Sequence, residues 1–554
     1  MTFLTVPRHL RILATFIIAL THPALAAIDP GEILIAEMNC AACHEVTPPI
    51  AARLASRPSA RLDAAHAVRV TAPWLRAFLE DPQATQPGTL MPDMLGGMDP
   101  AARHEAAEAL THYLVQLRGP EKDAAPVVSD ATLIETGKTL YHTAGCVACH
   151  APEAPPAEKM NNADAWADLD KLRQTSVPMG ALDLKYSPAE LAAFLQDPLK
   201  SRPGGRMPSL KLTAPEAQAI AAYLLRRPAP TGAKFAATPT PKSPAPNSKF
   251  TVDAARAARG KELFAVLNCA ACHPIGEPGG KAKPMARLNA RQPSGCLGTK
   301  PRAGVPRFEM NDRQRVVMLA HLGNQAALAE PLTPEQQITR TMTALNCYAC
   351  HARERRGGVE GSRREYFSGS LDLGDEGRIP PTLRGVGAKL RPESIKAILT
   401  AGESLRSYMA TRMPQYGVEN VGHLAALFDQ ADTRPETQVM PADQTAALDA
   451  PGRQLVGAGG LNCISCHNFD GHKSPGIPGL DLARATGRLK WDWFRRFLLD
   501  PPSVHSGTRM PVFWPAGVST NTGILGGDAE KQIQAIWTYL TRKDFADLPA
   551  GVGR

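Results

Sequence analysis

Residues 146–150 read Cys146-Val147-Ala148-Cys149-His150, and the pattern Cys-x-x-Cys-His occurs five times in the 554-residue chain. We number the copies motifs 1 to 5 in chain order: Cys40/Cys43/His44, Cys146/Cys149/His150, Cys269/Cys272/His273, Cys347/Cys350/His351 and Cys463/Cys466/His467. The abundance of Cys and His predicts roughly 0.006 copies by chance. The motifs use ten of the eleven cysteines, so their spacing indicates one repeated chemical task rather than a disulfide framework.

The spacing of each motif suits a porphyrin. Two thiols three residues apart at the start of a helical turn reach both vinyl groups of one haem, and the following His directs its imidazole at the iron. A structural zinc site would need further ligands and no His at this position. The motifs therefore predict five covalent c-type haems, attached by the ten cysteines and ligated by His44, His150, His273, His351 and His467.

A second repeat follows motifs 1, 2 and 5. A Phe-Leu-x-Asp-Pro segment starts at Phe78, Phe194 and Phe497, and in each case a Met-Pro pair follows ten residues after the Asp. The pattern predicts a helix that ends at Asp-Pro and a loop that presents a thioether. A Met is usually a core residue, but this fixed offset favours ligation of iron. The expected ligands are Met91, Met207 and Met510.

For motif 4 the corresponding ligand is expected at Met413, which precedes Pro414 and lies 62 residues after His351. Met409 and Met440, which precedes Pro441, are the rival residues for this position.

These units resemble class I c-type cytochrome domains, which are small all-helical folds with His/Met ligation of iron. Residues 379–387, Ile-Pro-Pro-Thr-Leu-Arg-Gly-Val-Gly, are similar to the loop of that family whose Pro packs near the proximal His. The resemblance covers essentially the whole mature chain and implies an all-α fold of five tandem domains. Their expected ranges are 27–120, 121–227, 256–331 (a reduced domain), 332–445 and 446–554, with a Pro/Ala-rich linker at 228–255.

The third unit departs from this pattern. An ungapped alignment of its closing helix with that of the second unit places Val305 over Met207, and the Phe-Leu-x-Asp-Pro helix is missing. Three interpretations remain open. Cys296, the eleventh cysteine, ligates the third iron as a thiolate; the third haem is five-coordinate and open to a small ligand; or a Met fills the position. The candidates for the last are Met285, Met310 and Met318.

The first 26 residues have the pattern of a secretory signal peptide. Arg8 and Arg11 precede an apolar run over residues 12–20, and Ala24-Leu25-Ala26 is a small-residue cleavage site. A retained membrane anchor is disfavoured because the apolar run is too short to span a bilayer. No later segment is apolar enough to cross one. We therefore expect cleavage near Ala26 and a periplasmic protein without a transmembrane segment.

Charge indicates no particular partner. Residues 1–26 hold two Arg and no acidic residue, so the mature chain has 60 basic and 53 acidic residues and a formal charge of +7. Five haems would add up to about ten propionate charges, which brings the holoprotein near neutrality. The chain has no basic stripe interleaved with aromatic residues, so nucleic acid is not an expected partner.

The expected function is electron transfer between redox partners through the five haems, with iron cycling between Fe(II) and Fe(III). The partners would be redox proteins, or a dehydrogenase or oxidase, acting as electron donor and acceptor. One alternative is a haem-dependent oxidoreductase with the third haem as its reactive centre. Another is an electron-accepting subunit of a dehydrogenase complex. No catalytic side chain is assigned, and the pattern specifies no oligomeric state.

Overall fold

The computed structural model describes residues 30–54, 57–64, 70–119, 130–153, 178–226, 250–276, 279–291, 293–434 and 445–553. The expected signal peptide (1–26) and residues 228–249 of the expected linker lie outside this part. The fold is mainly α-helical, as the sequence predicts. Within the described residues the strands are limited to one antiparallel pair, β1 (Ala352–Arg353) and β2 (Arg356–Gly357), in which Ala352 faces Gly357. No described helix combines the length and apolar character needed to cross a bilayer.

Each motif follows a helix that packs against a second helix from elsewhere in the chain, and we call the elements around one motif a module. In module 2, α7 (Ala131–Thr143) crosses α11 (Ala214–Leu224). A Cβ on Gly137 would lie 1.9 Å from the carbonyl oxygen of Ala219, so only glycine allows this close approach. The other helical elements of module 2 are η1 (Cys146–Ala148), α8 (Leu182–Lys185), α9 (Pro188–Gln196) and α10 (Pro198–Ser201).

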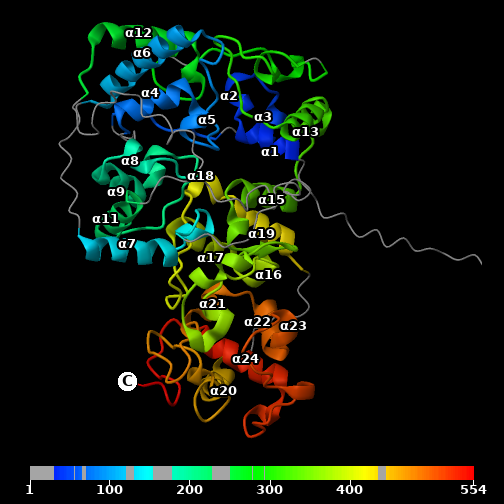
Figure 1. Cartoon of the computed structure of the whole chain (residues 1–554). Coiled ribbons are helices and arrows are strands. Elements are labelled where there is room, and N and C mark those ends of the chain that lie inside the picture. Colours follow the sequence, from blue (N-terminus) through cyan, green and yellow to red (C-terminus); the bar gives the residue numbers. More distant parts are fainter. Residues whose placement is uncertain are drawn as a thin grey trace, which may run out of the picture.

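Modules 1 and 3 exchange their halves. The helix before motif 3, α12 (Ala254–Val266), packs against α6 (Pro100–Arg118), which lies in the first sequence unit. A Cβ on Gly260 would lie 2.1 Å from the carbonyl oxygen of Ala109, which repeats the crossing seen in module 2. Conversely α1 (Pro30–Glu37), before motif 1, packs against α13 (Asp312–Leu322) of the third unit. Both exchanged pairs are visible at the top of Figure 1.

Two buried apolar clusters confirm that this exchange extends through the cores. One joins Leu79 and Leu110 to Phe264, and the other joins Ile35 to Leu322. The sequence assigns residues 27–120 and 256–331 to separate domains, whereas in the structure each range contributes to both modules. Module 3 also contains η3 (Cys269–Ala271), α4 (Ala72–Glu80) and α5 (Pro82–Thr85). Module 1 also contains α2 (Cys40–Cys43), α3 (Pro48–Arg53), η4 (Met285–Arg287), η5 (Gly295–Leu297) and α14 (Gln325–Ala329).

Module 4 pairs α15 (Pro334–Ala344) with α19 (Leu424–Asp432). The buried Arg353 guanidinium donates to Glu335 at 2.6 and 3.2 Å and to Asp432 at 2.9 and 3.1 Å, and so connects these helices. The remaining elements are η6 (Cys347–Ala349), β1, β2, η7 (Gly361–Tyr366), η8 (Leu371–Gly377), α16 (Val386–Lys389), α17 (Pro392–Lys396), the π-helix η9 (Ala397–Ala401) and α18 (Val418–Val421).

Module 5 pairs α20 (Thr445–Val456) with α24 (Ala529–Leu540), and Gly452 again lies against a helix backbone, here at Ala535. One apolar cluster runs through modules 4 and 5 from Ile338 to Phe545. In Figure 1, modules 3 and 1 lie at the top, modules 2 and 4 below them, and module 5 at the bottom. The other elements of module 5 are η10 (Cys463–Ser465), η11 (Leu482–Arg484), α21 (Ala485–Arg488), α22 (Trp491–Leu499), α23 (Pro501–Val504), η12 (Pro515–Gly517) and η13 (Leu525–Gly527).

Candidate haem-binding sites

All five motifs adopt the same local backbone, a single tight turn entered from a left-handed residue. The entry residues all have a positive φ, which Asn and Gly tolerate best; they are Asn39, Gly145, Asn268, Asn346 and Asn462. The N–H of each motif His then bonds to the carbonyl of the first Cys at 2.9–3.1 Å. The turn predicted from the spacing is therefore present at every motif.

Each of four motif histidines is oriented by a main-chain carbonyl. Nδ1 of His351 contacts the carbonyl oxygen of Pro381 at 2.7 Å, and Nδ1 of His467 contacts that of Leu480 at 2.9 Å. Such a bond holds the proton on Nδ1 and leaves the Nε2 lone pair for a metal. Burial also lowers the pKa of both rings, which favours the neutral form that binds metal. Pro381 lies in the loop whose resemblance to the family loop the sequence suggested.

In modules 1 and 3 the orienting carbonyls are exchanged along with the helices. His44 contacts the carbonyl of Lys283 at 2.6 Å, 239 residues later, and His273 contacts that of Ala60 at 2.9 Å, 213 residues earlier. The local pairing matches module 5: His44 forms a parallel bridge with Ala282, as His467 does with Gly479. Residues 282–283 therefore pair with His44 and orient its ring in motif 1, as residues 479–480 pair with His467 and orient its ring in motif 5.

The repeated Met-Pro loops lie in the apolar clusters that hold motif cysteines. Met207 packs in the cluster of Cys146, and Met510 packs in the cluster of Cys463. Met91, which the sequence assigns to the haem of motif 1, packs instead in the cluster of Cys269. The exchange therefore associates Met91 with motif 3 instead of motif 1, and ligation of iron by Met91 stays a prediction.

Met413 is less well placed. Its side chain is 38% exposed and is not part of the cluster that holds Cys347. The adjacent Arg412 is bound to module 2, because its backbone N–H donates to the carbonyl of Ala144 at 3.0 Å. Met409 is half-buried on the same segment, and Met440 lies outside the described residues. The sixth ligand of motif 4 stays the prediction that the sequence made.

Cys296 lies at motif 1 rather than at motif 3. Its Sγ is 4.0 Å from Nε2 of His44, and the same apolar cluster contains Cys40. Burial raises the pKa of the Cys296 thiol, so a thiolate here would need a bound cation to stabilise it. Met285 is buried, and its N–H donates to the carbonyl of Glu45 at 2.9 Å. This bond ties the main chain at Met285 to the residue that follows His44.

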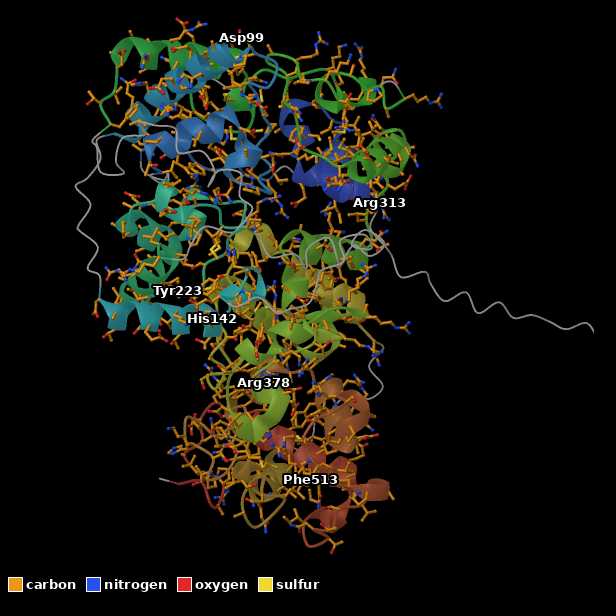
Figure 2. All side chains as sticks on the ribbon, viewed as in Figure 1. Asp99, His142, Tyr223, Arg313, Arg378 and Phe513 are labelled. Atoms are coloured by element: carbon orange, nitrogen blue, oxygen red, sulfur yellow. The ribbon has the colours of Figure 1, made fainter. Side chains whose placement is uncertain are left out.

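Two pairs of motifs lie in direct contact. The thiols of Cys43 and Cys272 lie close enough for each to shift the pKa of the other, which joins motifs 1 and 3. Between motifs 2 and 4, Asn346 Nδ2 lies 3.4 Å from Cys149 Sγ, and Arg363 donates to the carbonyl of Val147 at 2.5 Å. Figure 2 shows His142 and Tyr223 together in module 2; the His142 ring also lies 5.4 Å from that of Tyr366 in module 4.

Cys466 differs from the other motif cysteines in its exposure. The sequence gives it the same haem-attaching role as the other motif cysteines, yet Cys466 is exposed whereas the other nine are half-buried. The reason is the position of motif 5. The neighbouring motif approaches the second cysteine of motifs 1 and 2, Cys43 and Cys149, but among the described residues no other motif contacts motif 5. The Cys466 thiol lies 3.6 Å from the hydroxyl of Ser465 in its own turn, and its attachment to haem stays a prediction.

The residues present fit a covalently held porphyrin. Each motif presents two thiols and an imidazole from one turn, and the four rings described above keep Nε2 available. The three arginines that precede the methionines expected as ligands contact protein acceptors. Arg206 pairs with Glu37, Arg412 with Glu216, and Arg509 donates to the carbonyl of Asp372.

Residues 134–227 match the family model for cytochrome c. This range contains most of module 2, from α7 to α11, with Cys146, His150 and Met207 inside it. A cytochrome c domain implies a covalent c-type haem and haem-based electron transfer. Comparison of the chain with curated proteins and with solved structures gave no significant match.

Proposed function

We propose that the chain is an exported pentahaem c-type cytochrome that transfers electrons between redox partners. The observation that carries the proposal is that the local architecture of module 2, the matched cytochrome c domain, recurs at the other motifs. Helix crossings at Gly137, Gly260 and Gly452 share one geometry. The proposal assigns one haem to each motif and an electron-carrying role to the whole assembly.

The arrangement of the modules supports transfer within the chain. Motif 1 contacts motif 3 through Cys43 and Cys272, and motif 2 contacts motif 4 through Cys149 and Asn346. Modules 3 and 2 are joined where Thr71 N–H donates to Lys185, and modules 5 and 4 where Lys490 N–H donates to Lys389, both at 2.9 Å. These four junctions connect the motifs in the order 1–3–2–4–5, and a further hydrogen bond, from Arg340 to the carbonyl of Arg53, joins module 4 to module 1. We propose that electrons follow that order or its reverse.

The proposed location is the periplasm, with redox proteins or a dehydrogenase or oxidase as donor and acceptor. The pattern of a cleavable signal supports this location, as does the covalent attachment of haem through paired cysteines. Module 1 and module 5 lie at the two ends of the proposed route, so each is the proposed docking module for one partner. The exposed thiol of Cys466 supports this role for module 5, because it places the haem-attaching turn at the surface.

A potentiometric titration of the purified holoprotein tests the proposal. We expect reversible reduction of five haems by five electrons, followed by rapid reoxidation when a high-potential acceptor is added. A protein that takes up fewer electrons after complete maturation, or that reduces irreversibly, would contradict the proposal.

The position of Cys296 favours one second candidate, a haem-dependent oxidoreductase whose reactive centre is the haem of motif 1. A thiolate opposite His44 would give this haem a lower potential than its His/Met neighbours. The two candidates differ in whether the sixth position opens. Binding of carbon monoxide at one haem of the reduced protein would favour the enzyme, and full six-coordination would favour the carrier.

A further inference from the structure

Two lysines occupy matching positions at two junctions between modules. Lys185 of module 2 lies over the ring of Trp74 of module 3, with Nζ 4.4 Å from the ring centroid. Lys389 of module 4 lies over the ring of Trp493 of module 5 at the same distance of 4.4 Å. The two junctions involve different parts of the chain, so they form two independent examples of one arrangement.

The surroundings of the two lysines match in detail. The carbonyl of Lys185 accepts from Thr71 and that of Lys389 accepts from Lys490, both at 2.9 Å. Each tryptophan stacks on the phenylalanine four residues later, with centroids 4.8 Å apart at Trp74 and 4.7 Å apart at Trp493. Both junctions therefore share backbone pairing, ring stacking and the position of the ammonium group.

Each lysine also has an arginine that follows it by the same interval, Arg202 after Lys185 and Arg406 after Lys389. The charge of each arginine adds to burial in lowering the pKa of its lysine, well below the ordinary value for Lys185 and to about 7 for Lys389. Tyr186 connects the first pair, because Lys185 Nζ lies 5.1 Å from its ring centroid and Arg202 donates to its hydroxyl at 3.4 Å. Lys185 is only 5% exposed.

Among the described residues, carboxylates do not neutralise the positive charges of these Lys-Arg pairs. Lys185 donates to the uncharged Gln86 at 3.1 Å, and neither lysine forms a described ion pair. Arg488 adds a third cation beside Lys389, and the nearby Glu376 opposes these charges only in part. Desolvating several like charges without an anion is costly, so the arrangement calls for an anionic group at each junction.

We propose that Lys185 with Arg202, and Lys389 with Arg406, are equivalent sites that bind haem propionates at the junctions of modules 3–2 and 5–4. This inference rests on the proposed function, because it assumes haems in the adjoining modules. A propionate carries the charge that each pair lacks, and a haem has two. The lysines would then hold the haem edge at the place where one module meets the next.

The test uses the full-length holoprotein with Lys185→Met and Lys389→Met, read out by spectroelectrochemical titration. A cation beside a haem favours Fe(II), because reduction removes one positive charge from the iron. Each substitution is expected to lower the midpoint potential of a haem at its own junction by about 59 mV. For a one-electron couple this corresponds to an about tenfold lower ratio of reduced to oxidised haem at a fixed applied potential. Lys185→Arg and Lys389→Arg, which keep the charge, should stay near the wild type.

Lys396→Met is the matched control, since Lys396 is exposed on α17 and has no described ion pair. Lys185→Gln and Lys389→Gln are measured in parallel, so that a Met variant that does not fold leaves the test intact. If either neutral variant titrates like Lys396→Met, the proposed equivalence of the two sites is overturned. If the wild type carries five haems and takes up five electrons, such a result contradicts only this inference. If the wild type does not, the proposed function itself is refuted.

Discussion

Cys296 Sγ lies 4.0 Å from Nε2 of His44, although 252 residues separate them in the chain. If motif 1 holds a haem, the Cys296 sulfur and the His44 imidazole would both be near enough to contact its iron. The exchange of halves between modules 1 and 3 creates this relationship, because it brings residues 282–297 to motif 1.

Cys296→Ala should therefore change the haem of motif 1. If the thiolate binds iron there, the oxidised protein shows one low-spin EPR signal of thiolate type, and Cys296→Ala abolishes it. Replacing Cys40 and Cys43 with Ser should remove the same signal, whereas the matched replacement of Cys269 and Cys272 should leave it. If the signal is lost only in the variant without Cys269 and Cys272, Cys296 belongs to the haem of motif 3, as the sequence predicts.

Met91→Ala is expected to act on the haem of motif 3. Loss of the thioether should remove one haem's share of the weak near-infrared sulfur-to-iron band and lower the potential of that haem. Met94→Ala is the matched control, because Met94 packs in the same cluster. If the Met91→Ala change persists in protein without Cys269 and Cys272, the assignment to motif 3 is wrong.

Arg353→Met should destabilise module 4 by about 3 kcal/mol. The substitution leaves the carboxylates of Glu335 and Asp432 without the buried guanidinium that they share, and breaking a buried pair typically costs 3–5 kcal/mol. Chemical denaturation of the holoprotein, followed by the Soret band, measures the loss. Arg384→Met at an exposed position is the control. Equal denaturation midpoints for both variants would show that the ion pairs of Arg353 contribute little to stability.

The junction of modules 2 and 4 should weaken in acid. Hydrogen bonds from Arg412 lower the pKa of Glu216 to about 2 from an ordinary 4.5. Because the folded pKa is depressed, the stabilisation is present above pH 4.5 and is lost as pH falls toward 2. Glu216→Gln should be less stable than the wild type at pH 6, and the difference should shrink between pH 4.5 and 2. A difference that stays constant over this range would contradict the role of the ionised pair.

The sequence predicts the local structure of the sites well because that structure depends on neighbours in the chain. The turn at each motif needs only the Cys-x-x-Cys-His spacing and a preceding Asn or Gly. The association of Met207 with motif 2 is also local, since only 57 residues separate it from His150. These features are repeated, and repetition is visible without any structure.

The exchange between modules 1 and 3 is not predictable in the same way. Gly260 is suited to cross any helix with small residues, and the sequence does not distinguish Ala109 in α6 from positions in α13. One signal pointed to it: the third unit lacks the helix and Met that usually follow a motif. Lys185 and Lys389 were missed, although each stands three residues before a Pro and 17 before an Arg.

The exposure of Cys466 could not be predicted from the sequence either. Its motif has the same spacing as the other four, and the difference arises only from which modules meet. Local pattern therefore predicts the chemistry of each motif, whereas contacts between modules decide how far each motif is covered.

The central claim, five covalent haems on one exported chain, is tested most directly by the intact mass of the acid-denatured protein after maturation with a complete haem-attachment system. Acid denaturation releases any haem held only by axial ligands and keeps haem bound through thioethers. The account predicts a chain that begins near Ala27 and carries five haem additions. Four additions or fewer would contradict it.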